Sequence, residues 1–277
     1  RDPQYRPLAG GEGRLTLIGK SHPVGADKEM EKYFDIKYEF SLAEVHDAIA
    51  RQLKSQKPGY ICVADGVVLS VAHRNKEYME VQRDSMFALC DSNWVPLYIK
   101  WIWGRNRNQC CGAMIFEEVV KQGMYRQAFL GTNQRTLDAL KTSIEKWGVN
   151  TDRMMFVELP HCQVDDFDYP EVAKRLDDFD AEVIWVALGA PKQECFMHNL
   201  KPHLKHGVQL GVGAAFNFHA GMNEKRAPKW MIRNRMEFIY RIMQDPKKQL
   251  RRCGLIVTTL PKILWEEMRR KRRGVHL

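Results

Sequence analysis

The chain has 277 residues, of which 44% are hydrophobic, and a formal net charge of +9. This is enough apolar material for one substantial core, and the length does not require two domains. Seven cysteines without a Cys-x-x-Cys pair argue against a disulfide framework or a zinc site and favour a reducing cytoplasm. No run of 18 or more apolar residues occurs, which excludes a spanning helix from this sequence, and the opening RDPQYRPLAG does not resemble a secretion signal.

The positive charge is concentrated near the C-terminal end. From Asn223 to Leu277 there are 16 Lys and Arg but 5 Asp and Glu, whereas the rest of the chain has a small acidic excess. A localised basic block is typical of a segment that meets a polyanion, such as phosphate groups, an anionic membrane surface or nucleic acid.

Apolar runs alternate with helical patterns along most of the chain. Residues 1–30 are polar and are interpreted as a loose lead-in, after which Ser41 and Glu44 give a capping box before the amphipathic stretch SLAEVHDAIARQL. Predicted strands GYICVADG, QAFLG, MMFVELP, EVIWVALG and GVQLGVGAAF then alternate with helices such as TNQRTLDALKTSIEKW, YPEVAKRLDDF and APKQECFMHNLKPHL. This order predicts an α/β fold with a mostly parallel, doubly wound sheet over residues 31–221.

The pattern changes after Gly221. KRAPKWMIRNRMEFIYRIMQDPKKQLRR is basic and helical, and GLIVTTLPKILW and RRKRR follow it. We therefore expect a helical appendage over residues 222–277. With Trp265 and its basic flank it can lie in a membrane interface, while packing on its own domain or on another subunit of a homo-oligomer remains the alternative.

Ligands of doubly wound sheets bind beyond the carboxyl ends of the strands. Here the candidate loops are VADG (63–66), CDSNW (90–94), LGTN (130–133), LGAPKQE (188–194) and GVGAAFNFHAG (211–221). Gly131, Gly189 and Gly213 would let a phosphate or sugar approach the backbone closely. A helix that starts at Pro191 would present free N–H groups to a diphosphate.

Four stretches carry a family resemblance. LGAPKQE, GVGAAFNFHAG, KRAPKWM and FIYRIMQDPKK, in this order and with these gaps, resemble the TagA-type family of bacterial glycosyltransferases (glycosyltransferase family 26), over roughly Glu31 to Arg252. The family includes the N-acetylmannosaminyltransferases of wall teichoic acid and enterobacterial common antigen assembly. The resemblance implies a single Rossmann-like domain with a helical C-terminal appendage.

The resemblance also implies an activity and a location. It implies an inverting transfer of N-acetylmannosamine, or a related hexose derivative, from a UDP-sugar to a polyprenyl-diphosphate-linked acceptor. The expected place is the inner face of the cytoplasmic membrane, with the enzyme bound peripherally.

Two aspartates match positions of this family. Asp91 in LCDSNW matches the aspartate proposed as catalytic base, with Ser92 where Gly is usual. A carboxylate there could take the proton of the acceptor hydroxyl, although a turn or helix-cap role is the alternative. Asp65 stands where the family usually has Asn and is expected to face sugar hydroxyls, or to be a turn residue. Ala113 and Met114 replace a usual polar pair, which leaves the donor sugar open.

The LGAPKQE loop and the turn after it supply further candidates. Gln193 matches the family glutamine and is expected to contact the donor, with Lys192 and Glu194 beside it. Glu194 could instead cap its own helix or hold Lys192. Phe216 and Asn217 are expected to line the pocket.

The appendage is expected to bind the leaving group. Negative charge builds on the β-phosphate of UDP, and without a metal cationic side chains must stabilise it. No paired-aspartate motif stands at a strand end, so we expect a metal-independent reaction without a cofactor. By resemblance, Arg241, Lys248 and Arg251 match basic positions proposed to close over the diphosphate, and Arg226 could serve similarly.

Two other functions are less consistent with the sequence. A Rossmann-type NAD-dependent oxidoreductase would need a third glycine where Phe216 stands in GVGAAF. A nucleic-acid-binding protein would need exposed aromatic residues among the basic ones, whereas the aromatics of the tail fall at core-like helical spacing.

Overall fold

The computed structural model describes residues 30–221, 231 and 237–274. Within these ranges eight strands form one sheet in the order β1-β2-β4-β3-β8-β7-β5-β6. The strands are β1 Lys32–Tyr33, β2 Ile36–Glu39, β3 Gly59–Ala64, β4 Ala88–Cys90, β5 Gln127–Gly131, β6 Met154–Val157, β7 Val183–Ala187 and β8 Val208–Gly211. Only β1 and β2 pair antiparallel, and every other pairing is parallel, which confirms the predicted α/β fold.

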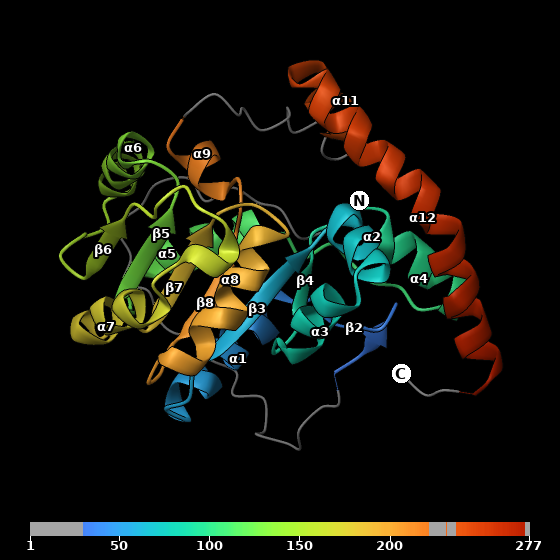
Figure 1. The fold of residues 1–277 in the computed structure, drawn as a ribbon, viewed down its shortest axis with the longest axis horizontal. Helices are drawn as coiled ribbons and strands as arrows, with labels where there is room; N and C mark the ends of the chain where they lie inside the picture. Colours follow the sequence, from blue (N-terminus) through green and yellow to red (C-terminus); the bar gives the residue numbers. More distant parts are fainter. Residues whose placement is uncertain (1–29, 222–230, 232–236, 275–277) are drawn as a thin grey trace, which may run out of the picture.

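Helices cover both faces of this sheet (Figure 1). They are α1 Leu42–Lys54, α2 Gly66–Arg74, α3 Lys76–Asp84, α4 Val95–Trp103, α5 Gly112–Gln122, α6 Gln134–Lys146, α7 Tyr169–Phe179, α8 Lys192–Leu200, α9 Ala215–His219, α11 Glu237–Gln244 and α12 Pro246–Arg272, with 3-10 turns at Val164–Asp166 and Lys201–His203. Helices α1, α5, α6 and α9 contribute to one hydrophobic cluster, and α2, α3, α4, α7 and α8 contribute to the other.

The strands are buried on both sides because their side chains alternate between these clusters. In β7, Val183 and Trp185 belong to the α1/α5/α6/α9 cluster, whereas Ile184 and Val186 belong to the opposite one. This explains why the strands read as continuous apolar runs in the sequence.

Several predicted elements are confirmed closely. Strand β5 and helix α7 have the expected bounds, and Ser41 caps α1 by accepting from the Glu44 N–H at 3.4 Å. The Asp-Pro sequence separates α11 from α12, because Pro246 begins the second helix. The β1–β2 hairpin and helices α2 to α5 were not predicted, since their apolar runs are short and lack strong boundary signals.

The sheet has two halves that the chain builds in turn. Strands β2, β3 and β4 form one half, and the next strand in the chain, β5, lies in the other half. Strands β7 and β8, which come later in the chain, fill the positions between β5 and β3. The carboxyl ends of β4, β3, β8 and β7 therefore lie side by side at the middle of the sheet, which is where such folds bind ligands.

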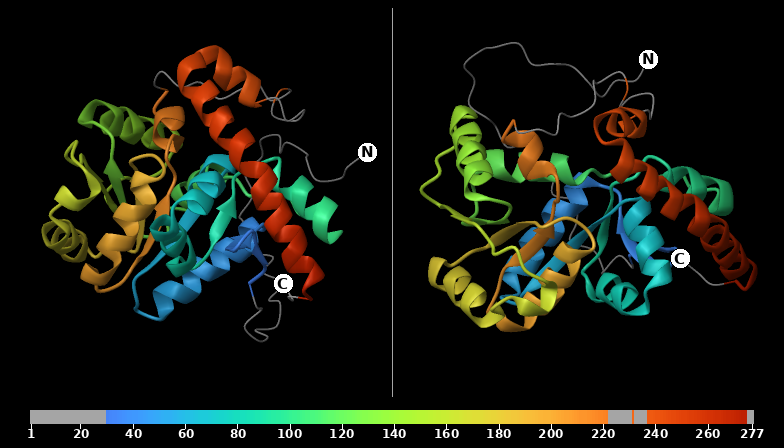
Figure 2. Two further views of the ribbon diagram at one scale, coloured as in Figure 1. Left: turned by 45° about the vertical axis from the view of Figure 1, so that its right-hand side comes forward. Right: turned by 45° about the horizontal axis from the view of Figure 1, so that its top comes forward.

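Helix α12 crosses one side of the domain (Figures 1 and 2). It has 27 residues and packs against α2 and α4. Ile263 from its inner face is 1% exposed and joins the α2/α3/α4 side of the core. Over the described residues no helix is both long enough and apolar enough to cross a membrane.

Candidate active site

A cleft of about 1310 Å³ opens at the carboxyl ends of β3, β4, β7 and β8. We call the loops after these four strands its floor, and the N-terminal half of α12, residues 246–260, its roof. Four of the five predicted loops line the cleft, whereas the LGTN loop at 130–133 does not. The site therefore lies at the centre of the sheet, as expected for this topology.

Asp65, in the loop after β3, links floor and roof. Its Oδ1 accepts from the backbone N–H groups of Val67 and Val68 at 2.8 and 2.9 Å, so it is the N-cap of α2. Its Oδ2 accepts from Arg252 Nη2 of α12 at 2.6 Å. Gly66 follows, and a Cβ there would lie 3.2 Å from Cδ1 of Ile256, which shows how closely the roof approaches.

Asp91, in the loop after β4, lies in the floor and is partly exposed. Its backbone N–H donates to the Ala64 carbonyl at 3.1 Å, which ties the two neighbouring loops together. The next residue, Ser92, accepts from the N–H groups of Trp94 and Val95 at 3.1 and 3.3 Å. Ser92, which stands where the family usually has Gly, thus holds the two backbone N–H groups at the start of α4.

Gln193 is fixed in the floor by two contacts of its amide group. It is 3% exposed and lines the cleft. Its Oε1 accepts from the Gly189 N–H at 3.2 Å, and its Nε2 donates to Glu194 Oε1 at 2.8 Å. The expected donor-contact residue is therefore present in the cleft with a defined amide orientation.

Glu194 accepts the hydrogen bond from Gln193 on the side away from the cleft. It has no exposed surface, does not line the cleft, and accepts from the Tyr78 hydroxyl at 3.0 Å. Burial raises the pKa of this carboxyl to about 7, against the opposing effect of its hydrogen bonds. The structure thus corrects the prediction of a direct ligand contact for Glu194, because the chain packs around it completely.

Two other residues of the LGAPKQE loop also lie off the cleft. Lys192 donates to the Cys162 carbonyl and lies over the ring of Phe167, rather than pairing with Glu194. Pro191 is exposed and precedes α8, but it is not part of the cleft wall. Within the first turn of α8, Lys192 thus points toward the 162–167 segment, whereas Gln193 points to the cleft.

Gly131 and Phe216 have structural roles rather than the predicted lining roles. Gly131 has φ +108°, and a Cβ there would lie 2.8 Å from the Ala187 carbonyl oxygen, so only glycine allows β5 and β7 to meet. Phe216 is 1% exposed and packs on Phe116 and Phe129 at centroid distances of 5.7 and 5.9 Å. Neither residue lines the cleft.

Three other predicted residues do line the floor. Gly189 and Gly213 have φ values of +76° and +52°, which favour glycine, and Asn217 follows in α9. Gly211 also lines the cleft, and a Cβ there would lie 3.1 Å from the Gln193 amide nitrogen. The floor is therefore largely backbone between β7 and β8, which leaves room for a ligand.

The roof contributes positive charge. Arg251 lines the cleft as predicted, together with Arg252 and Lys247, which were not chosen although they belong to the same basic run PKKQLRR. Arg226 lies outside the described residues. For Arg241 and Lys248 the structure describes only the backbone, in α11 and α12 respectively.

The N-terminus of α5 also opens into the cleft. Cys111, Gly112 and Ala113 line it, and the side chain of the N-cap residue Cys111 makes no capping hydrogen bond. A Cβ on Gly112 would lie 3.1 Å from the Val63 methyl groups, so glycine keeps α5 close to β3. In the sequence, Ala113 and Met114 stand out only as a departure from the polar pair that is usual in the family, so these positions were not predicted as site residues.

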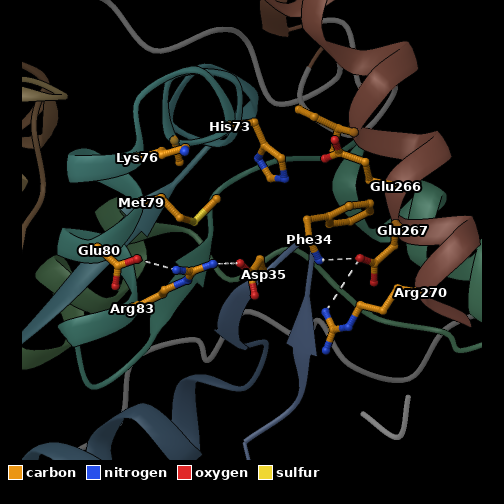
Figure 3. A pocket seen from close by; sticks show the side chains of 12 residues that line it. Phe34, Asp35, His73, Lys76, Met79, Glu80, Arg83, Glu266, Glu267 and Arg270 are labelled. Carbon is orange, nitrogen blue, oxygen red and sulfur yellow. Dashed lines mark hydrogen bonds and ion pairs between the residues drawn. The ribbon is translucent and has the colours of Figure 1, made fainter. Parts of the chain in front are cut away.

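A second cavity of about 430 Å³ lies between the C-terminal half of α12, helices α2 and α3 and the β1–β2 turn (Figure 3). Its charged side chains pair with one another: Arg83 contacts Asp35 and Glu80, and Arg270 lies 3.7 Å from Glu267. Glu267 is 3% exposed, and burial raises its pKa. Because most of these charges are paired within the cavity, although Arg270 Nη1 is buried without a hydrogen-bond partner, we regard this cavity as the anchorage of α12.

Glu267 is the centre of this anchorage. It accepts from the Phe34 N–H at 3.1 Å and from Trp103 Nε1 at 2.9 Å. It thus connects α12 both to the β1–β2 turn and to the end of α4.

The described residues contain no group of three or more His, Cys, Asp or Glu arranged to hold a metal ion. Metal independence nevertheless stays a prediction.

Comparisons with known proteins agree on one family. The family model described as "Glycosyl transferase WecG/TagA/CpsF family" matches residues 33–276. A protein of Bacillus subtilis (strain 168), named N-acetylglucosaminyldiphosphoundecaprenol N-acetyl-beta-D-mannosaminyltransferase, is 26% identical over 238 residues, which cover 83% of this chain and 89% of that protein. A protein of the same name from Bacillus spizizenii (strain ATCC 23059 / NRRL B-14472 / W23) is 24% identical over 212 residues, 73% of this chain and 78% of that protein.

Proposed function

The chain belongs to the WecG/TagA/CpsF family of glycosyl transferases, and on that premise we propose its reaction. It transfers N-acetylmannosamine, or a related hexose derivative, from a UDP-sugar to a saccharide on a polyprenyl diphosphate, with inversion at the anomeric carbon. The names of the two Bacillus relatives support the sugar and the lipid-linked acceptor. The product would serve the assembly of a cell-surface polysaccharide.

One observation carries this proposal: a single cleft holds a carboxylate in its floor and cations in its roof. Asp91 lines it from the end of β4, and Arg251 and Lys247 line it from α12. A sugar transfer from a nucleoside diphosphate needs a base at one end of the reacting bond and positive charge at the other.

The chemistry can be assigned to these groups. The Asp91 carboxylate takes the proton from the acceptor hydroxyl as that oxygen attacks the anomeric carbon. The bond from this carbon to the β-phosphate oxygen breaks, and its electron pair leaves with UDP. Attack from the face opposite the leaving group inverts the anomeric configuration.

The diphosphate is proposed to lie between α5 and the roof. The N-terminus of α5 presents backbone N–H groups and the positive end of a helix dipole to the cleft. Arg251 and Lys247 supply full charges from the opposite side. These groups would stabilise the leaving UDP without a metal ion or cofactor.

The outer face of α12 suits the proposed place on the inner surface of the cytoplasmic membrane. Leu250 and Trp265 are large hydrophobic residues that are exposed on this helix and do not line the cleft, and its last turn is basic from Arg269 to Arg272. Exposed apolar side chains beside cations favour an anionic lipid interface. The inner face of α12 packs on its own domain. The alternative that the appendage packs on its own domain therefore applies to one side of this helix.

The reaction is tested with a panel of UDP-sugars offered to the full chain with a short-chain polyprenyl-diphosphate acceptor carrying N-acetylglucosamine. We expect acceptor-dependent UDP release with UDP-N-acetylmannosamine or a related UDP-hexose, unchanged by EDTA, and a product of inverted configuration by NMR. No release with any donor would reject the proposed activity, and strict metal dependence would reject the role of the cations.

Membrane binding is tested separately, by sedimentation with vesicles containing anionic lipid. We expect a Leu250→Glu/Trp265→Glu double variant to bind such vesicles at least about tenfold more weakly, because each change removes an apolar contact and adds a repelled charge. Equal binding would favour an apolar contact with a second copy, which size-exclusion chromatography would then detect.

A further inference from the structure

The contact between Asp65 and Arg252 crosses the cleft. It joins residues 187 positions apart, one in the floor and one in the roof, at 2.6 Å. Both side chains line the cleft, and they are 31% and 32% exposed, so a ligand that enters the cleft can reach the pair. The charge of Arg252 is thus matched by a carboxylate within the chain.

Asp65 does not need Arg252 for its other role. Its Oδ1 caps α2 through the two backbone N–H groups of Val67 and Val68, while Oδ2 alone holds Arg252. Removing the ion pair therefore leaves the cap in place, and a ligand can take Arg252 without unfolding the start of α2.

Helix α12 does not need the pair either. At its far end Glu267 is buried and accepts from the Phe34 N–H and Trp103 Nε1, as described for the second cavity (Figure 3). Ile263 is buried against the core, and Ile256 lies against Gly66. The roof accordingly stays docked when Arg252 changes its partner.

We propose that Asp65 and Arg252 form a strap across the cleft, which the diphosphate of the donor opens by taking Arg252 from Asp65. A diphosphate offers several charged oxygens to a guanidinium and so competes well with one carboxylate oxygen. The opened Asp65 then has Oδ2 free to accept from a hydroxyl of the donor sugar. The strap thus makes Asp65 a determinant of donor affinity, a role that rests on the proposed function.

The strap should weaken UDP binding, because the Asp65–Arg252 ion pair must break before the diphosphate can take Arg252. In the Asp65→Asn variant the cap persists, since asparagine caps helices as well as aspartate does, but the ion pair is lost. We expect UDP to bind this variant about two- to fivefold more tightly than wild type, the range for a half-exposed ion pair. Isothermal titration calorimetry of the full chain with UDP at low salt gives this ratio.

A matched control and a double variant separate the strap from a general charge effect. Asp168 caps α7 in the same way, by accepting from the Glu171 N–H at 3.0 Å, and it is exposed away from the cleft. We expect Asp168→Asn to leave UDP affinity unchanged. If the strap is real, Asp65→Asn tightens binding only when Arg252 is present, and has no effect in an Arg252→Gln background.

Each result decides the proposal. Tighter binding by Asp65→Asn that disappears in the Arg252→Gln background supports the strap. Unchanged or weaker binding, or tightening that persists without Arg252, overturns it. A wild-type chain that binds no UDP contradicts the proposed function itself, and that outcome is visible before any variant is compared.

Discussion

The floor and the roof of the cleft are built differently. The floor consists of strand-end loops whose polar groups are held from behind, as Gln193 is held by Glu194 and Gly189. The roof is a basic helix anchored at its far end by Glu267, and it reaches the cleft with half-exposed charged side chains such as Arg252. In the reaction that we propose, the floor would be a prearranged surface for the sugar and the roof an adjustable set of charges for the diphosphate.

The largest expected effect comes from removing the proposed catalytic base, Asp91, from the floor while the roof stays intact. Asp91→Asn should lower the transfer rate about 10²- to 10⁴-fold, because the acceptor hydroxyl loses its proton acceptor. UDP affinity should change by less than about twofold, since the roof cations remain. Initial rates of UDP release and calorimetric titration measure the two quantities, and a variant with wild-type turnover would remove Asp91 as the base.

The prearranged character of the floor can be tested through Glu194. Its pKa of about 7, raised by burial, means that the folded state holds its proton more tightly than the unfolded chain does. This contribution to stability is present below about pH 4.5 and is lost as pH rises through 7. Relative to Glu194→Gln, we expect the wild-type free energy of unfolding to fall by about 3 kcal/mol between these pH values.

Urea unfolding at a series of pH values measures that difference. Only its change with pH is diagnostic, because glutamine also replaces one acceptor by a donor beside Tyr78 and Gln193. Parallel stability curves for the two proteins would contradict a buried, proton-binding Glu194.

The roof is tested at its anchorage. Glu267→Ala leaves the Phe34 N–H and Trp103 Nε1 without their acceptor, and should lower the free energy of unfolding by about 2 kcal/mol. The adjacent Glu266 is exposed and lies 3.8 Å from Lys262, so Glu266→Ala is the matched control, with an expected change below about 0.5 kcal/mol. Equal losses in the two variants would show that Glu267 does not anchor the helix.

The sequence predicts the floor better than the roof, for physical reasons. Strand β5 and helix α7 are encoded locally, by an apolar run and by an Asp-Tyr-Pro helix start, and both have the expected bounds. The loops after β3, β4, β7 and β8 follow from the topology rule for parallel sheets. What local sequence cannot encode is a contact such as Asp65 with Arg252, because it depends on where α12 packs.

Residues were misassigned where backbone geometry decides their role. Gly131 was expected to admit a ligand, but it admits the neighbouring strand β7 instead. Phe216 follows a glycine-rich turn that does line the cleft, yet α9 turns its ring into the core beside Phe116. In both cases the residue types fit a ligand-binding loop. The backbone nevertheless directs each residue toward the rest of the protein and not toward the cleft.

The most direct test of the account is a crystal structure of the protein with UDP bound. We predict that the diphosphate lies in the central cleft, between the N-terminus of α5 and the roof, with Arg252 turned from Asp65 toward the phosphates. UDP bound in the second cavity or elsewhere on the surface, or an occupied cleft in which the cations of α12 face away from the phosphates, would contradict it.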